Sequence, residues 1–164
     1  MFTGAIAASY YGTPRTTMDV DIIIQATQKD AAKLAAALRD ADILHQETQI
    51  SAALSSDYRI LSLQDTHTPY TVDIILSSEP LEKRAATIAG HPTYIQTPEA
   101  LILAKLRMIK ATIPRERAQK DQDDINAILR NTQVDINYIK RRAKKEETLP
   151  ILENLLNYPK HSKN

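Results

Sequence analysis

The chain has 164 residues, 43% of them hydrophobic and 25% charged, which is the composition of a globular domain that buries a core without disulfides or a structural metal. Its formal net charge of +1 does not select a polyanionic partner, and the lack of cysteine excludes disulfides, thiolate zinc sites and cysteine nucleophiles. No apolar run approaches the roughly 20 residues of a membrane helix, and no signal-peptide pattern opens the chain, so we expect a cytoplasmic protein with no membrane partner.

The first third of the chain predicts two helices around one strand. A short helix over 5–11 follows Gly4 and ends at the break formed by Gly12 and the proline two residues later. Residues 20–24 are apolar and mostly β-branched, which predicts a buried strand. The alanine-rich stretch at 28–41 predicts a helix, because its leucines recur at a spacing of four.

The next segment predicts a further helix and a hairpin. A helical pattern covers roughly residues 47–55. Two strand-like runs follow, at 58–63 and 70–76, and the polar link at 64–69 between them predicts a hairpin.

The second half of the chain reads as helical throughout. Thr97 is a good N-cap for a helix that runs until Pro114, with proline and glutamate in the first turn. Another helix is expected over 117–131, Asp135 caps a third, and a last one covers 149–158.

Together these elements predict an α+β fold in which a small mixed sheet is flanked by helices and followed by a helical C-terminal half. The architecture changes near residue 96. We therefore expect residues 1–96 to form the core with the sheet, and residues 97–164 to form a helical part packed on that core within the same domain.

Two acidic side chains stand at the start of the first predicted strand. Asp19 and Asp21 are two residues apart, so both point to one face of the strand while Val20 and Ile22 turn to the other. Two like charges on a strand repel each other, and a divalent cation removes that penalty. Mg²⁺ in particular takes a few carboxylates, several waters and substrate phosphates. The alternative is an acidic pair in a turn or on a solvated strand, which is common.

A third acidic residue, Asp73, lies inside the apolar run at 70–76. A lone buried aspartate is costly and needs a partner. If this strand pairs beside the one at 20–24, Asp73 completes a cluster of three carboxylates. Two metals held there can clamp the attacking and leaving oxygens of a phosphoryl transfer, and Asp73 is then the natural general base.

Residues 3–24 resemble the polymerase-beta-like nucleotidyltransferases, in particular the prokaryotic group related to AbiEii-type toxins. That group shows a glycine turn, a short helix, a Gly-x-Pro-Arg-x-Thr stretch and then Asp-hydrophobic-Asp, and this chain has Gly12-Thr-Pro-Arg-Thr-Thr before Asp19-Val-Asp21. The segment Thr97-Pro-Glu-Ala-Leu-Ile-Leu-Ala-Lys105 is similar to the group's Ser-Pro-Glu-Asp-Leu-Ile-x-x-Lys helix. Arg117 followed by Lys-Asp-Gln-Asp-Asp-Ile at 120–125 is similar to its Arg-x-x-Lys-Asp-x-x-Asp-Ile segment.

The resemblance implies a Mg²⁺-dependent enzyme, with Mn²⁺ as an alternative metal. It would transfer a nucleoside monophosphate from an NTP to a hydroxyl of a tRNA, a protein or a small molecule. Asp19 and Asp21 match the paired metal ligands, and Asp73 matches the third carboxylate. If the chain is a toxin, an antitoxin is a partner.

Three further residues are expected at the nucleotide. Only three glycines occur, so no Walker loop or Rossmann fingerprint is available, and Gly4 instead allows close approach of the backbone to a triphosphate. Arg15 can pair bidentately with phosphate, or form an ion pair with Asp19 or another acid. Lys105, by resemblance, contacts the nucleotide phosphates; its alternative is a solvated helix lysine.

The acidic segment in the second half has two interpretations. Lys120, Asp121 and Asp124 either form an internal ion-pair network that positions helices or help to shape the nucleotide site.

One departure from the resemblance concerns the start of the chain. The related proteins usually carry a helix and a strand before the glycine turn, whereas Met1 here stands three residues before Gly4. Either the true start lies upstream, or another element or subunit covers the open edge beside the strand at 20–24, or the protein is degenerate. An edge left open promotes association and would allow homo-oligomers to form. This departure also supports an alternative function, a catalytically inactive binding module with the same fold.

A basic run, Lys-Arg-Arg-Ala-Lys-Lys at 140–145, has two interpretations. It is either a solvated helix face balanced by Glu146 and Glu147 or a guide for a nucleic-acid acceptor.

Overall fold

The computed structural model of the protein describes residues 1–114 and 118–157. The chain divides into two compact units, which we describe separately. The first consists of Met1–Ala7 and Arg15–Gln96, and the second of Ala8–Pro14 and Thr97–Asn164. Helix α1 (Gly4–Tyr11) contributes residues to both units.

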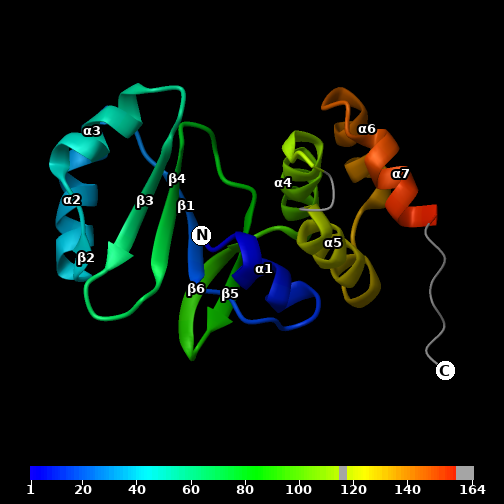
Figure 1. Ribbon diagram of the computed structural model, residues 1–164, viewed down its shortest axis with the longest axis horizontal. Coiled ribbons are helices and arrows are strands. Elements are labelled where there is room, and N and C mark those ends of the chain that lie inside the picture. Colours follow the sequence, from blue (N-terminus) through cyan, green and yellow to red (C-terminus); the bar gives the residue numbers. More distant parts are fainter. Residues whose placement is uncertain (115–117, 158–164) are drawn as a thin grey trace. The chain divides into compact units, whose positions relative to one another are not determined.

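The first unit contains a mixed four-stranded sheet in the order β1-β4-β3-β2 (Figure 1). Strand β1 (Asp19–Gln25) pairs in parallel with β4 (Thr71–Ser77), and β4 pairs antiparallel with β3 (Ile60–Asp65). The short β2 (Ile43–Leu44) completes the sheet beside β3. The predicted hairpin is confirmed, and β1 and β4 are neighbours, which is the condition under which Asp73 joins the other two acids.

One face of this sheet is covered by two helices. The 3₁₀ turn η1 (Gln28–Asp30) leads into α2 (Ala31–Asp40), and α3 (Glu47–Ser55) follows β2. Both helices bury apolar side chains against inward-facing residues of the strands, which together form the core of the first unit: Leu34, Leu38, Ile50, Leu54, Leu61, Leu63, Ile74 and Leu76. The strand predicted at 20–24 is only half-buried, because the helices cover one of its two faces.

A second, two-stranded sheet was not predicted from the sequence. It is the hairpin of β5 (Lys83–Ile88) and β6 (His91–Gln96), which turns at Gly90 with φ +81°. Its strands consist mostly of exposed residues without apolar alternation, so the pattern that marks β1 and β4 is missing here.

Residues 1–3 connect the two sheets. Phe2 bridges antiparallel to Ile22 of β1 and parallel to Ile95 of β6. The main chain of Thr3 donates to the carbonyl of Asp21 at 3.0 Å, and that of Ile23 donates to the carbonyl of Met1 at 2.8 Å. Of the alternatives for the edge beside β1, coverage by another element is confirmed for this stretch, because residues 1–3 pair with it.

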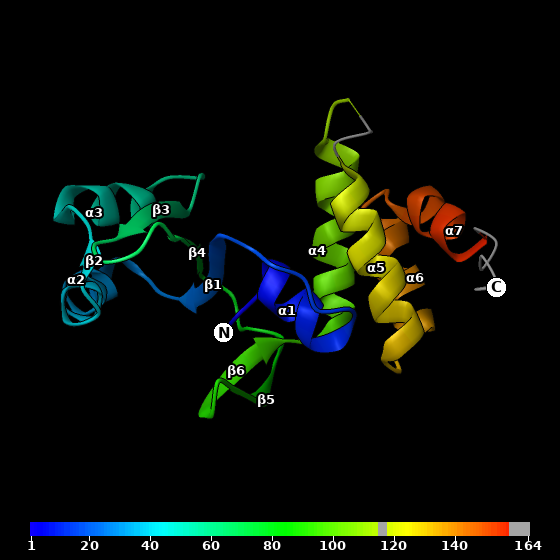
Figure 2. The same ribbon diagram turned by 60° about the horizontal axis from the view of Figure 1, so that its bottom comes forward.

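Beyond β6, the described residues of the second unit form four helices: α4 (Pro98–Ala111), α5 (Gln119–Asn131), α6 (Ile136–Lys145) and α7 (Leu149–Asn157). Helix α4 packs against the other three, and Figure 2 shows α4, α5 and α6 side by side. The predicted caps are confirmed: Thr97 Oγ1 accepts from the main chain of Ala100 at 3.4 Å, and Asp135 Oδ1 accepts from that of Tyr138 at 2.9 Å. The helical C-terminal half is thus confirmed, and Tyr158, at the end of the last predicted helix, lies outside the described residues.

Fully buried aliphatic side chains from all four helices form the core of this unit: Leu101, Ile102, Leu106, Ile125, Ile128, Ile139 and Leu152. No helix in the described part of the chain is long and apolar enough to cross a membrane.

Candidate active site

The parallel pairing of β1 and β4 sets two aspartates side by side. Asp21 is the register partner of Asp73, and Asp19 is the partner of Thr71. Neighbouring residues in register on parallel strands project to the same face of a sheet, and neighbouring strands lie roughly 4.8 Å apart. Asp19, Asp21 and Asp73 therefore share one face. The spacing of Asp19 and Asp21 predicts this for those two, and the pairing of the strands adds Asp73.

That face is the one opposite α2 and α3. The intervening residues Ile22 and Ile74 pack into the core beneath the helices. On β3, the register partners of Asp73 and Thr71 are Ser62 and Gln64, which are both exposed. The alternation of the three strands thus produces a polar face that combines carboxylates with hydroxyl and amide groups, and we call Asp19, Asp21, Ser62, Gln64, Thr71 and Asp73 the polar face.

Asp19 is exposed and is held by two threonines. Thr71 Oγ1 donates to Asp19 Oδ1 at 2.6 Å, across the two strands. The main chain of Asp19 donates to Thr17 Oγ1 at 3.2 Å, which fixes the loop before β1. Nothing in the sequence alone singles out Thr71. Thr71 lies two residues before Asp73, just as Asp19 lies two residues before Asp21. Once the two strands are paired in register, this spacing sets Thr71 beside Asp19.

Asp21 is half-buried and lies against Gly4, the first residue of α1. Gly4 has φ +57°, a conformation that favours glycine. A Cβ at position 4 would overlap the carboxylate of Asp21 and come within 2.8 Å of its Cβ. Glycine is therefore required here for two reasons: the backbone conformation and the space taken by the Asp21 side chain.

Buried polar contacts fix the residues around Gly4. The hydroxyl of Thr3 donates to Oε1 of Gln96, and both residues are buried. The main chain of Ala7 donates to the carbonyl of Thr3 at 3.2 Å, which begins the hydrogen bonding of α1. The N-terminus of α1 is in this way tied to β1 through Thr3 and to β6 through Gln96.

The polar face suits a divalent cation in the type of its donor atoms and in the placement of its strands. Carboxylate oxygens are the ligands that Mg²⁺ prefers, and a register pair places two of them on neighbouring strands. As the side chains stand, no three acidic or histidine side chains among residues 1–114 and 118–157 are gathered closely enough to hold a metal ion. A metal site on this face would therefore require its acidic side chains to adopt other rotamers.

Arg15 and Lys105 have different surroundings. Arg15 is exposed in the loop before β1, within the first unit. Lys105 belongs to the second unit, where its side chain is only 7% exposed. Its ammonium group lies 2.8 Å from Asp121 and 2.8 Å from Asp124. The solvated-lysine alternative is therefore wrong, and the phosphate contact of Lys105 stays a prediction.

The ion-pair network expected between helices is present with a different cation. Lys105 of α4 pairs with Asp121 and Asp124 of α5, whereas Lys120 is exposed. Arg117, the first residue of the similar segment, lies outside the described residues. Two helices of the second unit are thus joined by a cation between two carboxylates.

Neither a scan against protein-family models nor a search of curated proteins finds a match to this chain. The residues of the polar face, and the register that brings them together, are therefore the basis on which its function is proposed.

Proposed function

We propose that the protein is a nucleotidyltransferase that transfers a nucleoside monophosphate from an NTP to a hydroxyl group of an acceptor. The observation that carries the proposal is the register pair of Asp21 and Asp73, with Asp19 on the same face of the sheet. Asp21 and Asp73 are half-buried on neighbouring strands and the exposed Asp19 lies on the same face, so a bound cation would offset the repulsion between their like charges.

In this reaction the three acids of the polar face have defined roles. Asp19, Asp21 and Asp73 would hold Mg²⁺, or Mn²⁺ in its place. Mg²⁺ held there would neutralise charge on the triphosphate and lower the pKa of the attacking hydroxyl. Asp73 accepts the proton of that hydroxyl as its oxygen bonds to the α-phosphorus. The bond between the α-phosphorus and the bridging oxygen breaks, and pyrophosphate leaves.

Gly4 and Arg15 would contact the triphosphate from the first unit. The glycine lets the main chain before α1 approach Asp21 closely, and the first turn of a helix offers main-chain N–H groups to an anion. Arg15 supplies a planar group that can bind two phosphate oxygens at once. Their combination with the acids would place the α-phosphorus beside the carboxylates.

Calorimetric titration with each of the four NTPs, with and without Mg²⁺, tests the nucleotide site. We expect Mg²⁺-dependent binding of at least one NTP, lost when Asp19 and Asp21 are both changed to Asn. Asp57→Asn is the matched control, because Asp57 is an exposed acid outside the polar face. Both variants should fold. The changes at 19 and 21 relieve a repulsion between like charges, and Asp57 is exposed.

A transfer assay tests the reaction. With an NTP labelled at the α-phosphate, label should pass to an acceptor in a cell extract and pyrophosphate should be released, and Asp73→Asn should abolish both. Metal-dependent binding without any transfer would instead support the alternative, a nucleotide-binding module that lacks catalysis. No binding of any NTP would overturn the proposal.

A further inference from the structure

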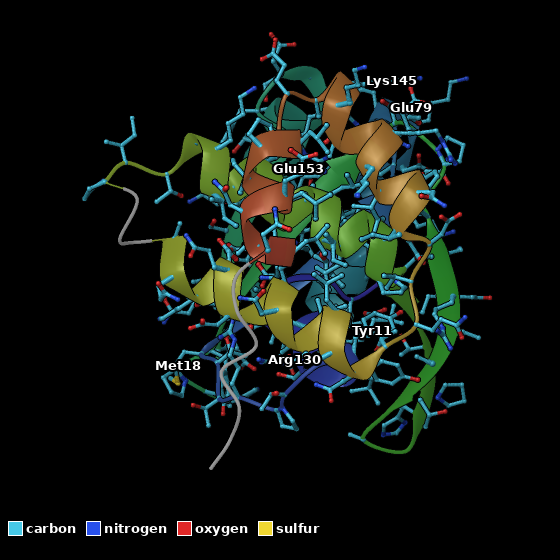
Figure 3. The ribbon with its side chains drawn as sticks, turned by 90° about the vertical axis from the view of Figure 1, so that its right-hand side faces the viewer. Tyr11, Met18, Glu79, Arg130, Lys145 and Glu153 are labelled. Atoms are coloured by element: carbon cyan, nitrogen blue, oxygen red, sulfur yellow. The ribbon has the colours of Figure 1, made fainter. Side chains whose placement is uncertain are left out.

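Helix α6 carries cations on the side that faces away from its buried side. Its ten residues include five lysines and arginines and no acid. Ile139 and Ala143 are fully buried in the second unit. At 100° per residue, four exposed cations and one amide occupy the opposite arc of the helix, and we call these residues the α6 cationic face: Asn137, Lys140, Arg141, Lys144 and Lys145. Lys145, at its C-terminal end, lies at the outer edge of the helices in Figure 3.

The acids that follow α6 are engaged by other cations. Glu146 accepts from Arg107 at 2.7 Å and from Arg142 at 3.4 Å. Glu147 accepts from Lys110 at 2.8 Å, and that bond holds the pKa of Glu147 below its usual range.

The expected balance of the basic run by these two glutamates is therefore found only for Arg142, which is not part of the α6 cationic face. No ion pair within residues 1–114 and 118–157 includes any of the four exposed cations.

We infer that the α6 cationic face binds the phosphodiester backbone of a nucleic acid. Cations three and four residues apart on a helix lie about 5–6 Å from one another, so the four form one continuous patch. Such a patch neutralises several phosphates without reading the base sequence. The formal charge of the whole chain, +1, conceals this local concentration.

Two other modes of binding fit the α6 cationic face less well: binding to an anionic membrane and stacking on the bases of a single strand. A helix that binds an anionic membrane also inserts apolar side chains beside its cations, and the α6 cationic face has none. Recognition of single-stranded bases uses exposed aromatic rings, but Tyr138 is half-buried and its ring and hydroxyl contact Arg142. Contacts to the phosphodiester backbone of a nucleic acid therefore fit this face best.

The binding itself does not depend on the proposed function. That the bound nucleic acid is also the acceptor of the nucleotide rests on the proposed function. Binding is therefore measured on protein that carries Asp73→Asn, without any NTP, so that its outcome is independent of catalysis.

The experiment measures fluorescence anisotropy with 30-nucleotide single-stranded RNA, the same DNA sequence and the duplex DNA, between 50 and 200 mM salt. With four cations in contact, affinity for the duplex should fall about 100-fold over this range. Lys140→Gln/Lys144→Gln should lower the slope of log affinity against log salt by about 1.8 for duplex and about 1.4 for single strands. The matched control is Lys29→Gln/Lys33→Gln, which removes two exposed lysines from the first unit.

The result expected is that the α6 variant loses salt-dependent affinity while the control keeps the wild-type slope and both keep the helical circular dichroism of the wild type. Equal losses in the two variants would overturn the inference, because binding would then follow net charge alone. An unchanged slope in the α6 variant, or no binding at 50 mM salt, would overturn it as well. Tight, α6-dependent binding to phosphatidylserine vesicles with none to nucleic acid would assign the face to a membrane instead.

Discussion

Thr71 donates its hydroxyl to the carboxylate of Asp19 across two parallel strands, at 2.6 Å. The bond orients the one acid of the polar face that has no aspartate as its register partner. A hydrogen bond of this kind to a metal ligand typically contributes about 10- to 100-fold to metal affinity. Thr71→Val should therefore weaken Mg²⁺-dependent NTP binding roughly 10-fold in calorimetry.

Thr87→Val is the control for this change, because Thr87 is an exposed threonine on β5 and the same atoms are exchanged. The role given to Thr71 is wrong if both variants bind the NTP equally, or if Thr71→Val lowers binding only by unfolding the protein.

Gly4→Ala should lower the stability of the protein more than Gly90→Ala, which changes a glycine in a hairpin turn. Alanine at φ +57° costs about 1–2 kcal/mol in the backbone, and overlap with Asp21 adds about 1–3 kcal/mol. Gly90→Ala has a comparable φ of +81° and nothing within 4 Å of the new Cβ, so it carries only the backbone cost. Urea denaturation of both variants measures the difference, and equal losses of stability would show that Asp21 yields without cost.

Lys105→Met should destabilise the protein by about 3 kcal/mol, because it removes a buried ammonium group that pairs with both Asp121 and Asp124. Lys110→Met, on the same helix, removes an exposed pair with Glu147 and should cost less than 1 kcal/mol. Chemical denaturation compares the two. If Lys105→Met instead keeps full stability and loses NTP affinity, the lysine serves the nucleotide and not the join between α4 and α5.

Acid should weaken the turn between β3 and β4. The main-chain N–H of His67 donates to Asp65 at 2.7 Å and holds the pKa of that carboxyl below its usual value, with a second donor from Thr68. Because the folded state lowers this pKa, Asp65 stabilises the fold above about pH 4, its ordinary range, and the contribution is lost as the pH falls through the lowered value.

Urea midpoints measured from pH 6 to pH 2 test this. Asp65→Asn should be less stable than wild type at pH 6, and the two should converge toward pH 2. A gap that does not change with pH would mean that the charge of Asp65 contributes nothing.

The sequence predicts the elements that carry their own local signals. The β-branched runs predict β1 and β4, and the caps at Thr97 and Asp135 predict where α4 and α6 begin. It also predicts that Asp19 and Asp21 share a face, since strand alternation needs no knowledge of the partner strand. The pairing with Asp73 was conditional on two strands being neighbours, and the structure supplies that condition.

Long-range pairing accounts for what the sequence does not predict. The hairpin of β5 and β6 has little apolar pattern of its own, and Phe2 bonds to it through the carbonyl of Tyr94 and the main chain of Gln96. Lys105 appears from its charge to be a solvent residue, whereas its neighbours Leu101, Ile102 and Leu106 mark a buried side of α4. These neighbours predict that Lys105 is buried, but they do not predict its pairing with Asp121 and Asp124 on α5.

The bond between Thr3 and Gln96 closes a loop of 93 residues. Closing so long a loop has a high entropic cost, and contacts of this separation form late in folding, after local helices and hairpins. The same bond fixes Gly4 beside Asp21. We therefore expect the polar face to gain its final shape in one of the last steps of folding, and local opening of this tie to inactivate the site while the helix-covered face of the sheet stays folded.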